Sequence, residues 1–251
     1  MKLSKIATSL VLPIALSGCY ILKVPVYENL EFKKDINYEC GANKRTLEAL
    51  LGEVWDSGFF AKNDTVNKEI RNNKYGIFSI LEMVDVCYRC RGIFLHDRFG
   101  ILKDKILLYE DLICSEEKGK LEKAKPILIH ELFHDFFTNI LTSEQKEGVI
   151  SEAKKFYDKI IKVNSKEKRL NVLRSFGLSE PKESDYHAYR HICDRGTMYG
   201  LLDRAEDFFN DEIYALIAES AFSNEIVIPK PLRIFYKNII SEKILNRNTI
   251  R

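Results

Sequence analysis

Apolar residues recur at helical spacing along most of the second half of the chain. Ile129, Leu132, Phe133, Phe136 and Ile140 stand at offsets of 3, 4, 7 and 11 from the first, as on one buried face of a helix. Similar spacing predicts helices over the ranges 45–60, 122–141, 143–163, 166–176, 211–222 and 231–245, with shorter helical segments ending near 72 and over 185–193.

Proline and glycine support several of these boundaries. Pro126 and Pro231 stand near the starts of two predicted helices, where the missing N–H of proline is tolerated. Gly177 follows the range 166–176, at the position where a left-handed residue commonly ends a helix.

Between residues 75 and 109 the pattern changes to short runs rich in β-branched and aromatic residues. These runs cover the ranges 75–81, 83–88, 93–95 and 106–109. Glycine and Asp-containing breaks separate them, which is typical of strands joined by turns. The sequence therefore predicts an α+β fold, in which a small sheet of three to five strands is followed by a mainly helical body.

Composition sets only broad limits. With 251 residues and 45% hydrophobic content, the chain can bury the core of one domain. The 39 basic residues nearly balance the 37 acidic ones, and no basic stripe with interleaved aromatics is present. Nucleic acid is therefore not an expected partner.

The first nineteen residues have the pattern of an export signal. Lys2 and Lys5 precede the apolar range 6–16, which is too short to span a membrane as a folded helix. The run ends in Leu16-Ser17-Gly18-Cys19, which resembles the lipobox of bacterial lipoproteins. An exported protein in which the cysteine is incidental is the alternative.

The lipobox resemblance implies cleavage before Cys19 and attachment of lipid to that residue. Acyl chains would then hold the protein on a membrane, since each buried methylene contributes about 0.8 kcal/mol. The expected organisation is a signal peptide over 1–18, a lipidated tether over 19–43 and one domain over 44–251. The expected location is the extracytoplasmic face of the bacterial cell envelope. By the same resemblance, the residue after the cysteine, Tyr20, is not the Asp associated with inner-membrane retention, which favours the outer membrane if the cell has one.

Five cysteines follow Cys19, and an oxidising compartment would allow disulfides. The odd number leaves at least one thiol outside an intramolecular pair. One or two ordinary disulfides are favoured over a redox or zinc role for the CxxC pair, with the pairing left open. The five are Cys40, Cys87, Cys90, Cys114 and Cys193.

The candidate chemistry centres on residues 130–134, His-Glu-Leu-Phe-His. On a helix, His130 and His134 share a face about 6 Å apart, which suits two nitrogen ligands of one zinc ion. Glu131 lies beside that face, where it can take a proton from a water at the metal. The sequence therefore predicts a zinc site with Glu131 as general base.

Zinc enzymes need a third protein ligand. A histidine six residues after the second is excluded, because Ile140 stands there. A glutamate on the later helix is the alternative. Glu212 ranks first, since Ala215 one turn on allows close helix approach; Glu219 ranks second and Glu206 third.

The HELFH motif, followed by E-I-Y-A-L-I-A-E-S-A-F from residue 212, resembles the gluzincin metallopeptidases, in particular the lethal-factor-type and Mlc-titration-factor-type groups. This resemblance covers the two signatures only. It implies His130, His134 and Glu212 as zinc ligands in a zincin-like body. Thermolysin-like enzymes place an Asp four residues after the ligand Glu to orient a histidine, whereas Leu216 stands here, which leaves Asp135 as a weak candidate for that role.

Two further features are expected of such an enzyme. Tyr199, in the sequence Gly-Thr-Met-Tyr-Gly, is the candidate oxyanion donor in a turn before the glutamate helix. The strand over 106–109 is the candidate edge strand that would pair with an extended peptide substrate.

The expected function is that of a lipid-anchored zinc metallopeptidase acting on a peptide or protein substrate. One alternative is a zinc-binding lipoprotein that presents a peptide groove without cutting. The other is a structural envelope lipoprotein in which HELFH is coincidental. Hydrolysis of non-peptide amides, such as cell-wall links, is not separated from peptidase activity by the sequence.

Overall fold

The protein is described here by a computed structural model. It describes residues 26–32, 44–78, 91–96, 104–113, 118–203, 206–223 and 226–246. Cys19, the predicted signal peptide and the cysteines at 40, 87, 90 and 114 lie outside these ranges. Cys193 is buried in the helical body. In the described ranges, no helix has the length and apolar character needed to cross a membrane.

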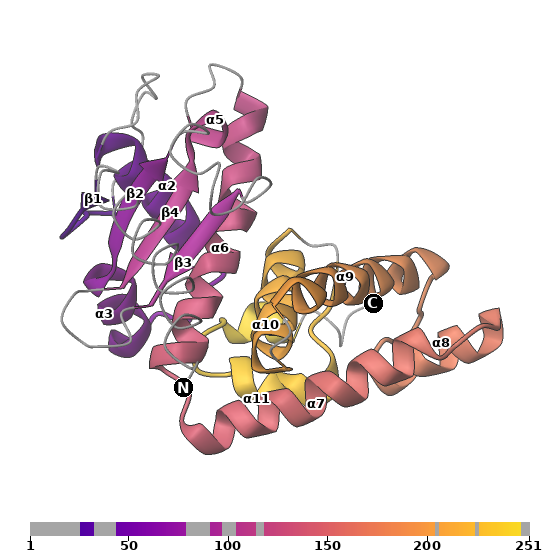
Figure 1. Ribbon diagram of the computed structural model, residues 1–251. Coiled ribbons are helices and arrows are strands. Elements are labelled where there is room, and N and C mark those ends of the chain that lie inside the picture. Colours follow the sequence, from indigo (N-terminus) through magenta and orange to yellow (C-terminus); the bar gives the residue numbers. More distant parts are fainter. Residues whose placement is uncertain are drawn as a thin grey trace, which may run out of the picture.

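The chain forms an α+β fold, as predicted: a small mixed sheet against a helical body (Figure 1). The strands are β1 (Val26–Tyr27), β2 (Lys74–Phe78), β3 (Gly92–Leu95) and β4 (Lys105–Tyr109). The helices are α2 (Lys44–Asp56), α3 (Asp64–Asn72), α5 (Glu110–Ile113), α6 (Lys118–Asn139), α7 (Ser143–Ile161), α8 (Lys166–Ser175), α9 (Glu183–Asp203), α10 (Glu206–Phe222), α11 (Arg233–Tyr236) and α12 (Glu242–Leu245), with a 3-10 turn η1 (Lys230–Leu232).

The four described strands lie in the order β1-β2-β4-β3. The central pair, β2 and β4, is parallel, whereas β1 and β3 join it antiparallel from the two sides. The prediction that residues 106–109 form an edge strand is therefore wrong. Ile106 and Leu108 of β4 are fully buried, because they pack in the core between the sheet and the helices. In the described sheet, the edge strand next to β4 is β3.

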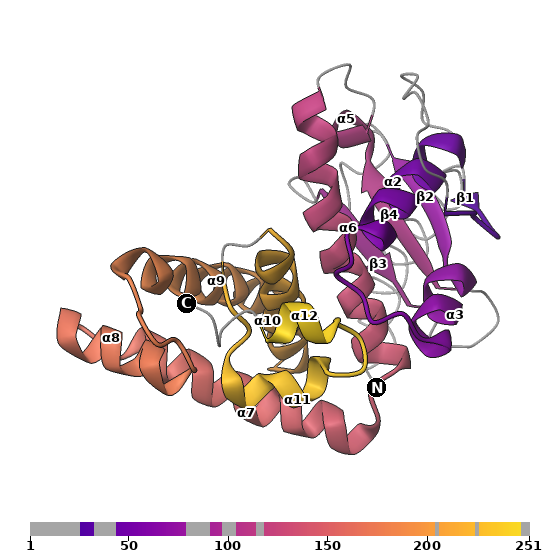
Figure 2. The ribbon, with the colours of Figure 1, turned by 180° about the vertical axis from the view of Figure 1, so that it is seen from behind.

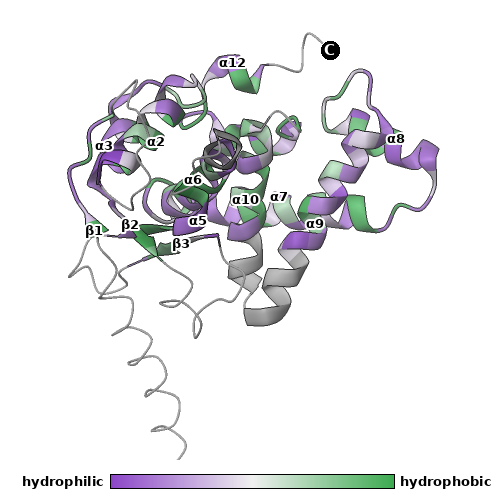
Figure 3. Ribbon diagram, turned by 90° about the horizontal axis from the view of Figure 1, so that it is seen from above, coloured by the Kyte–Doolittle hydropathy of each residue, from purple (hydrophilic) through white to green (hydrophobic). Residues whose placement is uncertain are grey.

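Helices cover one face of the sheet (Figure 3). Helix α6 packs against β3, β4 and α2 on one side and against α10 on the other. It thus stands between the sheet and the helical body. Figure 2 shows this arrangement from behind. The two signatures singled out in the sequence lie on these two neighbouring helices, α6 and α10.

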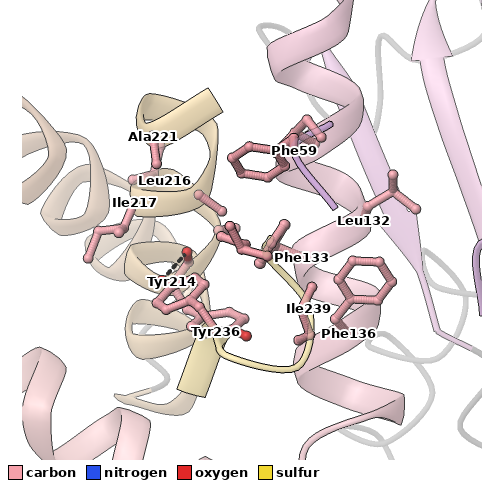
Figure 4. Close-up of a cluster of buried hydrophobic side chains, with 14 of the residues drawn as sticks. Phe59, Leu132, Phe133, Phe136, Tyr214, Leu216, Ile217, Ala221, Tyr236 and Ile239 are labelled. Carbon is pink, nitrogen blue, oxygen red and sulfur yellow. Dashed lines mark hydrogen bonds between the residues drawn. The ribbon is translucent and has the colours of Figure 1, made fainter. Parts of the chain in front are cut away.

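Phe133 of α6 joins the segment after α2 to the helical body. Its ring contacts Phe59 and Phe60, which follow α2, at centroid distances of 6.2 and 6.4 Å. It also contacts Tyr214 of α10 at 5.6 Å and Tyr236 of α11 at 5.7 Å. Figure 4 shows Phe133 between Phe59 on one side and Tyr214 and Tyr236 on the other. This aromatic cluster fixes α6 against α10, and so fixes the distance between the two signatures.

Local sequence signals account for several helix ends. Asn63 caps α3 by accepting a hydrogen bond from the Val66 N–H. Thr142 and Gln145 form a reciprocal capping box at the start of α7. Gly177 has φ +96 after α8, which confirms its predicted role as a helix-ending residue.

Tertiary contacts override the sequence pattern at other boundaries. Helix α6 begins at Lys118, so Pro126 lies inside the helix and not in its first turn. The range 231–245 is divided into η1, α11 and α12. The break holds Ile240, which bridges to Phe60, so pairing with the segment after α2 interrupts that predicted helix.

The segment predicted to be a tether contributes to the folded part. Val26–Tyr27 pairs with β2 as strand β1, and Leu30 is buried in the core. The sheet therefore includes residues that precede position 44.

Candidate metal centre

Helices α6 and α10 run antiparallel where they meet. His134 of α6 contacts Asp211 and Glu212 of α10, whereas His130, one turn earlier on α6, contacts Glu212 and the later Glu219. The buried Ala215 and Ala218 on α10 leave room for this close approach. The two signatures therefore face each other across one helix interface.

Three donor groups converge at the centre of this interface. The Nε2 atoms of His130 and His134 lie 3.0 Å apart. The two oxygens of Glu212 lie 3.2 Å from the Nε2 of His130 and 3.2 Å from that of His134. All three side chains are buried, and they form a group that could hold a metal ion.

The spacing of these atoms fits a small divalent ion. Ligand atoms about 2.0–2.1 Å from a tetrahedral zinc ion lie about 3.3 Å from one another, close to the 3.0 and 3.2 Å seen here. Two imidazole nitrogens and a carboxylate are also a donor set that zinc favours. The residues therefore fit a zinc ion with a fourth position left for water or substrate.

The other ring nitrogen of each histidine faces a second carboxylate. The Nδ1 of His134 lies 2.8 Å from Asp211 Oδ2 in a hydrogen bond. The Nδ1 of His130 lies 3.0 Å from Glu219 Oε2, outside good hydrogen-bond angles, so the Glu219 contact acts mainly through charge. A carboxylate can accept the Nδ1–H of a neighbouring imidazole, so both partners favour the tautomer that carries the proton on Nδ1. The lone pair of each Nε2 is then directed at the centre.

The carboxylates around the two buried imidazoles favour positive charge in the site. Burial alone would lower the pKa of His130, but the Glu212 and Glu219 carboxylates outweigh it and raise the pKa to about 9. Burial would likewise lower the pKa of His134, and Asp211 and Glu212 raise it well above its usual value. For Glu212, the two imidazoles overcome burial and lower the carboxyl pKa. Either protons or a metal ion can supply the required charge.

Glu131 lies beside the ligand pair, on the side of α6 that faces the sheet. A Cβ atom at Gly92 of β3 would stand 2.7 Å from Glu131 Oε1 and 2.8 Å from its Cγ, closer than real carbon contacts allow. The missing side chain of Gly92 therefore makes the space that the buried Glu131 occupies. Burial raises the pKa of Glu131, against the opposing effect of the two imidazoles.

The other predicted site residues have different positions. Glu219 contacts the far side of the His130 ring, away from the centre, so the second-ranked candidate ligand is instead a partner of His130. Tyr199 belongs to α9, so the predicted turn before the glutamate helix is wrong. The helix continues through its two glycines and is longer than the segment predicted over 185–193. The side chains of Tyr199 and Glu206 lie outside the described residues.

Asp135, the weak candidate for orienting a histidine, is directed elsewhere. Its carboxyl accepts hydrogen bonds from Asn73 at 2.9 Å and Asn139 at 2.7 Å. Burial and the nearby Glu69 raise its pKa well above the usual value. Asp135 therefore links α6 to the segment between α3 and β2, and it does not orient the ligands through any described contact.

Sequence reasoning missed two residues of this site, Asp211 and Arg195. Asp211 directly precedes Glu212, and only the antiparallel direction of α10 shows that it meets His134. Arg195 reaches from α9 to Glu219, with its Nη1 3.2 and 3.3 Å from the two carboxylate oxygens. It lies in neither signature, so no motif points to it.

Comparison of the chain with protein-family models, with curated proteins and with solved structures gives no significant match.

Proposed function

We propose that this protein is a zinc-dependent metallopeptidase of the gluzincin type, anchored to a bacterial membrane through lipid on Cys19. The observation that carries the proposal is the convergence of His130, His134 and Glu212 donor atoms within 4.8 Å of one another. Glu131, beside the first histidine on the same helix, adds a candidate general base. The proposed anchor and extracytoplasmic location are supported by the lipobox-like sequence alone.

Zinc is favoured by the chemistry of the donors. Magnesium and calcium prefer oxygen ligands, whereas two imidazoles and one carboxylate with an open position are typical of hydrolytic zinc sites. A zinc ion held there would polarise the scissile carbonyl and lower the pKa of the attacking water toward about 7.

The residues of the chain would share the remaining work. Glu131 would accept a proton from the attacking water as the new C–O bond forms, and deliver it to the nitrogen of the leaving amine as the C–N bond breaks. Asp211 and Glu219 would hold the two imidazoles in the tautomer that presents Nε2. Tyr199 is the proposed donor to the developing oxyanion, in keeping with the sequence resemblance.

Strand β3 supports a peptide as the substrate. In the described sheet it has β4 on one side and no strand on the other. An extended peptide could add to that edge through main-chain hydrogen bonds. Because Gly92 of β3 lies against Glu131, a peptide paired with this strand would pass next to the general base.

The direct test combines zinc analysis with a peptide-library assay on the purified full chain and on Glu131→Gln. We expect stoichiometric zinc in both proteins, with hydrolysis about 10²–10⁴-fold slower in the variant, the usual contribution of a general acid–base group. A matched control is Glu152→Gln on α7, which replaces a partly exposed carboxylate that pairs with Lys155, and it should keep full activity.

Other outcomes would support different functions. Zinc without turnover in the unaltered protein would favour a non-catalytic zinc-binding lipoprotein that presents a peptide groove. Absence of stoichiometric zinc would favour a structural lipoprotein. Equal hydrolysis by the protein and Glu131→Gln would refute the assigned general base.

A further inference from the structure

The two histidines of the centre have unequal surroundings. The partner of His134, Asp211, has its second carboxylate oxygen buried without a hydrogen bond from the described residues. The partner of His130, Glu219, instead has both oxygens close to the Nη1 of Arg195, at 3.2 and 3.3 Å. A continuous chain of contacts therefore runs from α9 through Glu219 to the Nδ1 of His130.

The charge balance of the site indicates a role for Arg195. Glu131, Asp211, Glu212 and Glu219 lie around a centre that one divalent ion would occupy, so the carboxylates exceed the charge of the ion. Arg195 brings a permanent positive charge to this group. Its guanidinium pairs with both oxygens of Glu219, the carboxylate that faces the Nδ1 of His130.

Geometry also matters, because Glu219 could be a ligand as well as a partner. It stands seven residues, about two turns, after Glu212 on the same helix and was itself a candidate third ligand. Arg195 holds its carboxylate beside the far nitrogen of His130, away from the centre. The carboxylate is mostly buried, with 17% of the side chain exposed, whereas 31% of Arg195 is exposed.

We infer that Arg195 is a positioning residue of the metal centre, which acts on metal affinity through Glu219 and His130. The inference rests on the metal-binding part of the proposed function and does not depend on peptidase activity. A partly exposed ion pair contributes little to folding stability, so the effect of Arg195 should appear in metal binding more than in stability.

The test measures zinc affinity by competition with a chelator, using the full chain and the variants Arg195→Gln and Arg195→Lys. Loss of a group that orients a ligand typically weakens metal binding about 10–100-fold, and we expect this for Arg195→Gln. The lysine variant keeps the charge and should recover part of the affinity. The visible spectrum of the cobalt-substituted protein should change in Arg195→Gln, because it reports coordination of the ion.

Arg190→Gln provides a matched control on the same helix. Arg190 pairs with Asp194 at 3.0 Å, away from the centre, so its loss removes an equivalent α9 ion pair without reaching Glu219. Zinc affinity and the cobalt spectrum should be unchanged in this variant.

A double-mutant cycle with Glu219→Gln separates positioning from general damage. If Arg195 acts through Glu219, then adding Arg195→Gln to Glu219→Gln should cause little further loss of affinity. If the losses of zinc affinity in the two single variants multiply in the double variant, then the inference is overturned. It is also overturned if Arg195→Gln binds zinc as tightly as the unaltered protein. Either outcome would leave the proposed metal centre itself intact. Failure of the unaltered protein to bind zinc would overturn both proposals together.

Discussion

Helix α6 presents two differently built sides to its neighbours. Toward α10, each imidazole faces the shared Glu212 and a carboxylate of its own, so charges from both helices fix the ligand geometry. Toward β3, the carboxylate of Glu131 lies in space left by an absent side chain at Gly92. The first side is defined by electrostatic contacts and the second by steric fit.

The difference implies that metal binding and catalysis can be separated by mutation. Substitutions on the α10 side should alter the affinity for zinc and, through it, activity. Substitutions on the β3 side should alter activity while zinc stays bound.

The largest effect is expected for His134→Ala, on the α10 side. This change removes one of the three proposed ligands, the one that Asp211 holds, so zinc should no longer be stoichiometric. Activity should fall by at least about 1,000-fold, because Lewis-acid stabilisation supplies several kcal/mol to such reactions. Metal analysis and the peptide-library assay on the same preparation provide the measurement.

The matched control is His187→Ala, which removes an exposed histidine of α9 and should change neither zinc content nor activity. If His134→Ala retained stoichiometric zinc, then the α10 side of α6 would not be a metal site.

The second prediction concerns the β3 side. In Gly92→Ala the new Cβ would meet Glu131 Oε1 at 2.7 Å, so the carboxylate must move. A displacement of about 1 Å can lower turnover by about 100-fold, and we expect a loss of about 10–100-fold with unchanged zinc affinity. Rates at saturating substrate, together with chelator competition, test both parts.

Gly148→Ala serves as the control for crowding at a glycine. Its Cβ would meet the Phe235 ring at 2.8 Å, between α7 and α11. It should reduce stability but leave turnover per folded molecule unchanged. A loss of zinc in Gly92→Ala would show that the two sides of α6 are not independent.

Sequence periodicity identified most of the helices, because each buries one apolar face. The proposed metal ligands on α6 could be predicted from the sequence for the same reason. His130 and His134 are four residues apart and therefore share one helix face. Glu212 follows from the need for a third ligand on a later helix, with a small residue one turn on. The antiparallel arrangement of α6 and α10 is a tertiary property, so the separate partners of the two histidines, Asp211 and Glu219, could not be assigned from spacing.

The β3 side of α6 was less predictable from the sequence. β3 and β4 are both short apolar runs, and strand order depends on which one the chain places beside β2, so the wrong strand was predicted to be the edge. Similarly, the glycines around Tyr199 suggested a turn, whereas α9 continues through them. A glycine in a helix costs only about 1 kcal/mol relative to alanine, which packing can offset.

The smallest effect is expected for Thr142→Ala, which touches neither side of α6. Thr142 begins α7 by accepting a hydrogen bond from the Gln145 N–H at 3.2 Å, and the Gln145 Oε1 accepts one from the Thr142 N–H at 2.9 Å. Loss of such a cap lowers the free energy of unfolding by about 1 kcal/mol. Denaturant unfolding should detect this change, whereas zinc affinity and turnover of the folded protein should stay at the unaltered values. Thr142→Ser keeps the capping oxygen and should restore stability. A fall in zinc affinity in Thr142→Ala would mean that general loosening of the helical body reaches the centre, and losses seen in the other variants could then no longer be assigned to one side of α6.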